Sequence, residues 1–130
     1  MEKFPVVFED KLHLAQLAKE VWEALGCKDP LTRAFIRVAF VAFQVFDWKQ
    51  RQYGTRNIAQ KGAEGIVTRL WDKVSRIDNI YEKGKQDEPA GETVEDTFGD
   101  IGNYGLIGLM CRYGLWPGSP EQLRKIAGSE

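Results

Sequence analysis

The chain has 130 residues, 43% of them hydrophobic and 28% charged, which is the composition of a single globular domain. Four Trp, four Tyr and seven Phe supply enough apolar surface for a core, so extensive disorder is excluded. Eighteen basic and nineteen acidic residues give a net charge of −1. Direct DNA binding is therefore not expected, because it usually requires a positive excess.

The sequence contains neither a membrane anchor nor a cysteine motif for metal binding. No stretch approaches the ~20 consecutive apolar residues of a membrane span, and the first residues lack the basic region and apolar run of a signal peptide. Cys27, Cys111 and the single His13 are too few and too scattered for a zinc site. We therefore expect a cytoplasmic protein with reduced thiols and no membrane partner.

The spacing of apolar residues predicts two helices in the first part of the chain. A helix over about 9–25 is indicated by apolar residues at intervals of three and four, and Gly26 stands where such a helix stops. Asp29 and Pro30 are typical of an N-cap and a first helical residue, so a second helix is predicted from Pro30 to about Gln52. Its apolar residues surround most of the helix, which is typical of a central one.

A third helix, over about 63–81, has an apolar stripe and a basic stripe side by side. The apolar residues step by three or four: Ile66, Leu70, Val74, Ile77 and Tyr81. Arg69, Lys73 and Arg76, together with Asp72, follow a second helical line. The centre of this line lies roughly 110° from the apolar centre, so the basic stripe borders the buried face.

The fourth helix, over about 94–115, has an apolar face marked by Val94, Phe98, Ile101 and Leu109 and a polar line on its other side. Asp96, Asp100 and Asn103 form that line, which continues into Ile107 and Met110. We therefore expect a two-sided helix that is buried in its second half and has acids in its first half. Four glycines recur at every third position, and each costs about 1 kcal/mol relative to alanine in a helix interior. We expect something to approach this backbone closely, either a neighbouring helix or a ligand. The glycines are Gly99, Gly102, Gly105 and Gly108.

A capping box at Ser119–Gln122 opens a short C-terminal helix over about 119–127. No run with a period of two is long enough to indicate a strand. We therefore predict one all-α domain over residues 1–130, a compact helical bundle of four main helices plus the short C-terminal helix.

The acidic line favours a divalent cation. Asp96 and Asp100 stand one helical turn apart, and two carboxylates that converge repel each other unless a cation lies between them. Mg²⁺ is the natural ion for an all-oxygen site and usually contacts substrate phosphates. Asn103 is placed to orient a water or a sugar hydroxyl. The alternative is that these acids simply stabilise a helix N-terminus, where negative charge is favourable.

The basic stripe favours a phosphate ligand, because guanidinium groups bind phosphate with two hydrogen bonds. The alternative is a solvated face in which Asp72 bridges Arg69 and Arg76. A turn after the second helix adds Tyr53 and Asn57. Tyr53 is either a stacking platform for a base or a loop tyrosine packed on the core.

Together these residues resemble the phage nucleotide modification associated domain 1 family, which is similar to the MazG-like all-α nucleotide pyrophosphohydrolases. The resemblance extends over about residues 43–113. It lies in Tyr53-Gly54 and Asn57, then Arg69, Asp72-Lys73 and Arg76, then Glu95-Asp96, Asp100 and Asn103-Tyr104. It implies a helical bundle that processes nucleotides in phage-infected bacteria, in the host cytoplasm if the chain is phage-encoded. It also implies Mg²⁺ held by acids of two neighbouring helices. Thr97 and Asp100 take the ExxD spacing of those enzymes, with Asp96 one residue earlier.

The first hypothesis is a Mg²⁺-dependent nucleotide phosphohydrolase-like or phosphoryl-transfer enzyme. Asp96 and Asp100 would hold the metal, and the catalytic residues would be Asp72, Lys73 and Asp100. The substrate-binding residues would be Tyr53, Asn57, Arg69, Arg76, Asn103 and Tyr104.

The alternative hypothesis is a non-catalytic protein that sequesters a nucleotide or a cyclic nucleotide signal and so acts against host defence. Under either hypothesis the partner is a nucleotide or a nucleotide-derived small molecule. We also expect a homo-oligomer, a dimer or a tetramer, because the apolar second helix and the glycine-rich fourth helix leave more apolar surface than one chain covers.

Overall fold

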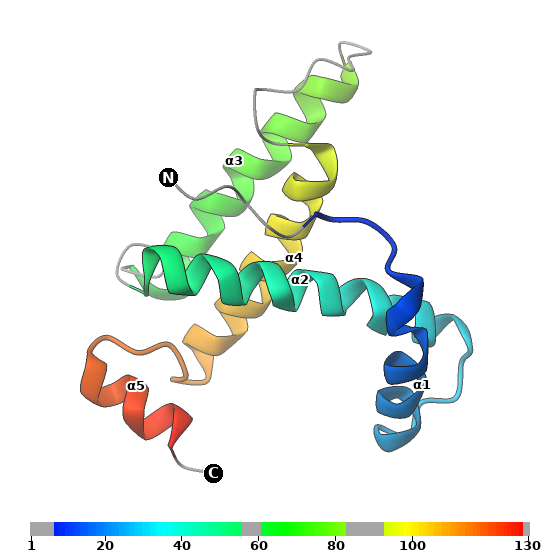
Figure 1. Cartoon of the computed structure of the whole chain (residues 1–130). Helices are drawn as coiled ribbons and strands as arrows, with labels where there is room; N and C mark the ends of the chain where they lie inside the picture. The colour runs from blue at the N-terminus through cyan, green and yellow to red at the C-terminus, as the bar shows by residue number, and fades with distance from the viewer. Residues whose placement is uncertain (1–6, 56–60, 83–92, 129–130) are drawn as a thin grey trace. The chain divides into compact units, whose positions relative to one another are not determined.

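The computed structural model describes residues 7–55, 61–82 and 93–128, and every regular element in these ranges is helical (Figure 1). The elements are a 3₁₀ turn η1 (Leu12–Leu14), α1 (Ala15–Ala24), α2 (Leu31–Tyr53), α3 (Gly62–Glu82), α4 (Val94–Arg112) and α5 (Pro120–Ala127). The predicted all-α class is confirmed. The contacts of the chain fall into two compact units, Met1–Trp48 and Lys49–Glu130, and α2 crosses the boundary between them.

In the first unit, α1 starts later than the sequence predicted. Asp10 lies outside the helix, and its carboxylate binds the Arg37 guanidinium through two hydrogen bonds of 2.6 and 2.8 Å. At the other end, Gly26 adopts φ +73° and stops the helix as predicted. The Trp22 indole donates to the Asp29 carbonyl at 2.8 Å, and the Arg33 guanidinium lies 4.2 Å from the Trp22 ring centre. These contacts attach α1 to the start of α2.

The Asp10–Arg37 pair makes the stability of the first unit dependent on pH. Hydrogen bonding to Arg37 lowers the pKa of Asp10 below its ordinary value. A carboxyl whose pKa is lowered by folding contributes stability above its unfolded pKa and loses it as the pH falls through the folded pKa. We therefore expect acid to destabilise wild type more than Asp10→Asn below the ordinary pKa of aspartate, as measured by thermal melts across that range. Equal acid sensitivity of the two proteins would contradict the pairing.

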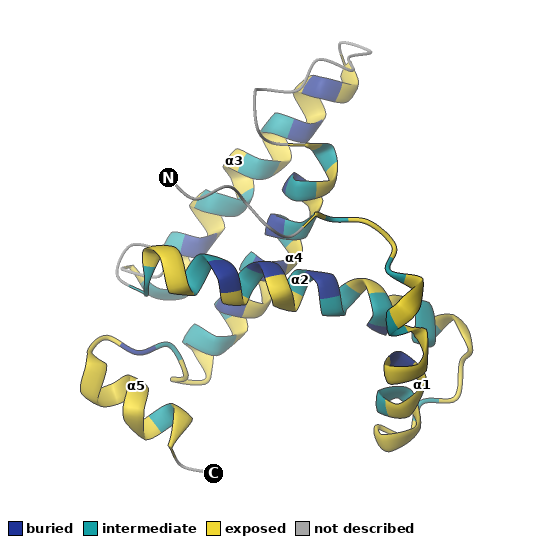
Figure 2. Cartoon of the chain, viewed as in Figure 1, coloured by how far each residue is buried: buried dark blue, intermediate teal, exposed yellow. Residues whose placement is uncertain are grey.

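Helix α2 is buried at four positions and exposed along much of the rest, as the colours of Figure 2 show for the whole helix. Val41, Val45 and Trp48 are 1–3% exposed and recur at helical spacing, and Ile36 is buried at another side of the helix. Leu31 and Phe35 are 76% and 74% exposed. The prediction that this helix is surrounded by other elements is therefore wrong for the described part of the chain.

In the second unit, α3 and α4 pack side by side and run in opposite directions (Figure 1). Two points establish the register: Ile66 lies next to Gly108, and Lys73 lies next to Asp100. The buried apolar residues of the pair are Ile66, Ile77, Ile80 and Ile107. Helix α4 ends at Arg112, earlier than predicted, because Gly114 adopts φ +71° and Leu115 N donates back to Met110 O at 2.8 Å.

The polar line of α4 is buried along much of its length. Its members Asp100 and Asn103 are 6% and 8% exposed, and Ile107, into which the line continues, is 4% exposed. Phe98 and Leu109 of the apolar face are 53% and 48% exposed, so the helix is buried mainly on one side rather than on both. The burial of the polar line places a carboxylate against α3.

Two of the four glycines of α4, Gly102 and Gly105, face open space within the described residues. A Cβ atom built on Gly102 or Gly105 meets no atom within 4 Å, and one on Gly108 lies 3.7 Å from Ile66. The described residues therefore do not show the close approach that was expected at Gly102 and Gly105.

Because these two sites have room for a methyl group, we expect Gly102→Ala and Gly105→Ala each to raise the free energy of unfolding by about 0.5–1 kcal/mol. Gly114→Ala is the matched control and should lower it by about 1 kcal/mol, since its left-handed backbone disfavours a side chain. Urea unfolding measures all three. A loss of stability in Gly102→Ala would mean that another surface packs against this helix, and the mass in solution would then tell whether it is a second copy.

Only one of the two hydrogen bonds of the capping box predicted for α5 is present. Gln122 N donates to Ser119 Oγ at 3.1 Å, but the Gln122 side chain accepts from Gly118 N at 2.6 Å instead of from Ser119 N. Across the described ranges, no helix is both long and apolar enough to cross a membrane.

Candidate functional site

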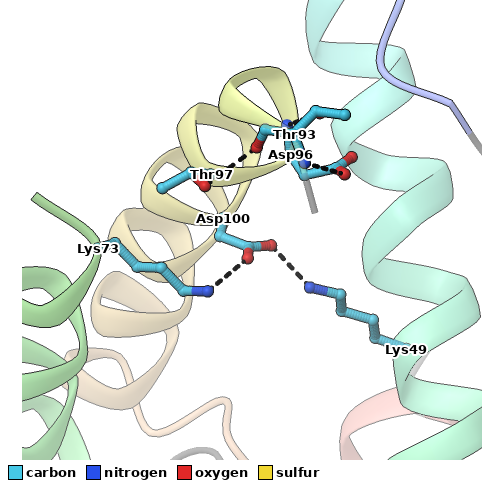
Figure 3. Close-up of polar contacts among 6 residues, drawn as sticks. All are labelled: Lys49, Lys73, Thr93, Asp96, Thr97 and Asp100. Carbon is cyan, nitrogen blue, oxygen red and sulfur yellow. Dashed lines mark hydrogen bonds and ion pairs between the residues drawn. The ribbon is translucent and has the colours of Figure 1, made fainter. Parts of the chain in front are cut away.

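The candidate site is a cluster of three charged side chains from three helices. The Asp100 carboxylate on α4 accepts from Lys49 Nζ on α2 at 2.7 Å and from Lys73 Nζ on α3 at 2.9 Å, one ammonium group on each oxygen (Figure 3). Asp100 is buried, with 8% of its side chain exposed. We call these three residues the lysine–aspartate cluster.

Local sequence explains how each lysine reaches the carboxylate. Lys49 follows the buried Val45 by one helical turn, so it stands at the end of the buried stripe of α2. Lys73 lies at the border of the buried face of α3, as the sequence predicted, and the antiparallel register brings it to Asp100. Long aliphatic stems let both ammonium groups reach the carboxylate from the edge of the core.

The cluster combines two ammonium groups with one carboxylate. The lysine side chains keep 33% and 21% of their surface exposed, so solvent reaches the cluster. Arg69 and Arg76 stand one turn to either side of Lys73 on α3 and are half-buried. Two further cations therefore flank the cluster on the same side of this helix.

Asp96 has a separate role in the structure. Its Oδ2 accepts from Thr93 N at 3.0 Å while Asp96 N donates to Thr93 Oγ1 at 3.0 Å, which completes a capping box at the start of α4 (Figure 3). Thr97 Oγ1 donates to the Thr93 carbonyl at 3.1 Å. The carboxylates of Asp96 and Asp100 thus have different partners.

This donor arrangement does not fit a Mg²⁺ site as it stands. An ion between Asp96 and Asp100 would compete with an ammonium group at each oxygen of Asp100, and Oδ2 of Asp96 is already bonded to the Thr93 amide. Within the described ranges, no group of three or more His, Cys, Asp or Glu side chains is placed to hold a metal. The Mg²⁺ site stays a prediction, and metal titration tests it.

The other residues predicted for the site lie in several places. Asn103 is buried on the inner face of α4, and Tyr104 beside it is half-buried. Asp72 is exposed on α3. Tyr53, 54% exposed, lines a separate hollow at the end of α2. Asn57 lies outside the described residues.

Lys49 was not among the residues predicted from the sequence. It follows the apolar Val45 by one helical turn, so it could have been found by looking for a cation beside an apolar stripe, the pattern that identified the basic stripe of α3. Trp116, which also lines the hollow at the end of α2, was missed as well because it lies in a turn with no helical pattern.

Comparisons of the chain with known protein families, curated proteins and solved structures found no match.

Proposed function

We propose that this protein binds a phosphate-bearing nucleotide, or a cyclic nucleotide signal, at the lysine–aspartate cluster. The observation that carries the proposal is the pair of lysine ammonium groups that converge on one buried carboxylate while their side chains stay partly exposed to solvent. Phosphate oxygens are strong acceptors for ammonium and guanidinium groups, and such charge-assisted hydrogen bonds are roughly twice as strong as neutral ones. Arg69 and Arg76 add positive charge on the same helix.

The Asp100 carboxylate supports this role by holding the two lysines in position. Without it, two like charges would repel and their side chains would occupy many rotamers. An acceptor that binds to both lysines therefore meets groups that are already oriented, which lowers the entropy lost on binding. That the phosphate belongs to a nucleotide is supported by the resemblance of residues 43–113 to nucleotide-processing families.

Binding is favoured over Mg²⁺-dependent hydrolysis or phosphoryl transfer because of how the carboxylates are used. Asp100, the one buried acid of the cluster, is paired with two lysines, and Asp96 caps α4. Asp72 is exposed on α3. Hydrolysis is the second candidate and an outcome of the same experiment.

The test is a panel of nucleoside mono-, di- and triphosphates and cyclic nucleotides, each incubated with the protein with and without Mg²⁺. Calorimetry measures binding, and chromatography measures whether the ligand is recovered intact. We expect binding that does not require Mg²⁺, recovery of intact ligand, and weaker affinity at higher salt because the contacts are ionic. New products that need Mg²⁺ would support the enzyme instead, and no binding by any member of the panel would refute the proposal.

A further inference from the structure

We propose that the hollow at the end of α2 binds the base of the nucleotide whose phosphates lie at the lysine–aspartate cluster, and that it binds the base by stacking with little preference among bases. This inference rests on the proposed function. It assigns the base to Tyr53, Trp116 and Leu123 and the phosphates to Lys49 and Lys73.

The hollow is large enough for a base and is lined by rings and apolar groups. It measures about 760 Å³ and lies among the end of α2, the start of α3, the end of α4 and the segment that leads into α5. Tyr53 is 54% exposed and Leu123 is 48% exposed, so both have apolar surface left to contact a ligand. The full lining among the described residues is Tyr53, Gly54, Thr55, Gly62, Cys111, Trp116, Pro117, Gly118, Ser119, Pro120 and Leu123.

Trp116 is half-buried at the wall of the hollow. Its Nε1 donates to the Thr55 carbonyl at 3.2 Å, which satisfies the polar atom of the indole. The turn at Gly114 reverses the chain after α4 and brings Trp116 to this place. Aromatic rings in such positions stack on bases of any type, because every base has a π-face.

The hollow and the cluster share one side of α2. Tyr53 follows Lys49 by four residues, so the two side chains lie on the same helix face about 6 Å apart along the axis. Cys111 follows Asp100 by eleven residues, or about three helical turns, and so returns to the same face of α4. We therefore place the base of a ligand whose phosphates contact Lys49 at the Tyr53 end of α2.

The residues to which the base is assigned contact its face rather than its edge. Two polar groups of the lining take part in the cap of α5: Ser119 Oγ accepts from Gln122 N, and Gly118 N donates to the Gln122 side chain. Discrimination between bases depends on hydrogen bonds to their edges, whereas stacking on Tyr53 and Trp116 is available to every base. We therefore expect adenine, guanine, cytosine and thymine nucleotides to bind with similar affinity.

Cys111 provides a direct probe of the hollow, and Cys27 provides a control in the same molecule. Both thiols are free and half-buried, but only Cys111 lines the hollow. The experiment measures the rate of alkylation of each cysteine by N-ethylmaleimide, resolved by peptide mass spectrometry, with no ligand, with ATP, with adenosine and with tripolyphosphate. Calorimetry measures the affinity of each ligand in parallel.

We expect saturating ATP to slow alkylation of Cys111 and to leave Cys27 unchanged, while tripolyphosphate binds without protecting Cys111. Tyr53→Ala should lower the affinity for ATP by about fivefold to a hundredfold and leave the affinity for tripolyphosphate unchanged. ATP, GTP, CTP and TTP should protect Cys111 alike.

The outcomes separate this inference from the proposed function. If ATP and tripolyphosphate bind equally well and neither protects Cys111, the phosphate site stands and the base site is refuted. If neither ATP nor tripolyphosphate binds, the proposed function fails and the base site fails with it. A preference of more than about tenfold for one base would overturn the assignment to stacking alone.

Discussion

Replacing Asp100 with alanine should lower the free energy of unfolding by about 3 kcal/mol, the largest stability effect that we expect from a single charged residue of this chain. The substitution leaves two ammonium groups facing each other without the carboxylate that both bind. We expect the lower end of the usual range for a broken buried ion pair, because the lysine side chains keep 33% and 21% of their surface in solvent. Urea unfolding of the second unit, followed by circular dichroism, measures the change.

Two further variants make this result specific. Asp100→Asn keeps an oxygen acceptor but loses the charge. Its free energy of unfolding should therefore lie between those of wild type and Asp100→Ala, about 2 kcal/mol below wild type. Asp78→Ala removes an exposed carboxylate from α3 and should change stability by less than about 0.5 kcal/mol. If Asp100→Ala is no more harmful than Asp78→Ala, the cluster does not hold α2, α3 and α4 at this point.

The largest effect on binding is expected from removing both lysines of the cluster. Each charge-assisted hydrogen bond from a lysine to a phosphate contributes about 1.5–3 kcal/mol, which is about a tenfold to hundredfold change in affinity. The double variant Lys49→Gln/Lys73→Gln should therefore bind nucleotide at least about a hundredfold more weakly than wild type in calorimetry. It should also show a weaker salt dependence of binding, because two of the ionic contacts are gone while Arg69 and Arg76 remain.

The control must separate binding from folding, since the same lysines pair with Asp100. Lys19→Gln removes an exposed lysine of α1 and should keep wild-type affinity. Thermal melts identify the temperature at which the double variant remains folded, and calorimetry is carried out there. If the folded double variant binds nucleotide with wild-type affinity, the phosphate does not bind at the lysine–aspartate cluster, and the proposed function is refuted.

Local pattern was enough to predict the helices, because the signals for them are local. Gly26 stops α1 through its left-handed backbone, and the apolar stripe of α3 predicted the buried Ile66 and Ile77. The boundaries were less accurate where a distant partner intervenes. Asp10 was placed in a helix, but the structure has its carboxylate on Arg37, which is 27 residues away in the chain.

The lysine–aspartate cluster could be predicted only in part. Its members Lys73 and Asp100 were predicted from spacing along single helices. Such spacing shows which residues share a face of one helix, but not which residues of another helix they contact. Asp96 and Asp100 share a helical line, yet one carboxylate turns back to Thr93 and the other reaches across to two lysines. That difference depends on the neighbours of α4.

The amino-acid pattern alone therefore specified an all-α chain, the approximate extent of its helices and a cationic edge on α3, since hydrophobic periodicity and capping act within a few residues. That α4 buries its acidic side and exposes Phe98 and Leu109 required the tertiary structure. The sequence predicted a helix with two buried sides in its second half, but only the tertiary structure shows that Asp100 is inside, where two lysines, 27 and 51 residues away in sequence, neutralise it. A buried charge is tolerated only when its partners are present, and those partners come from other helices.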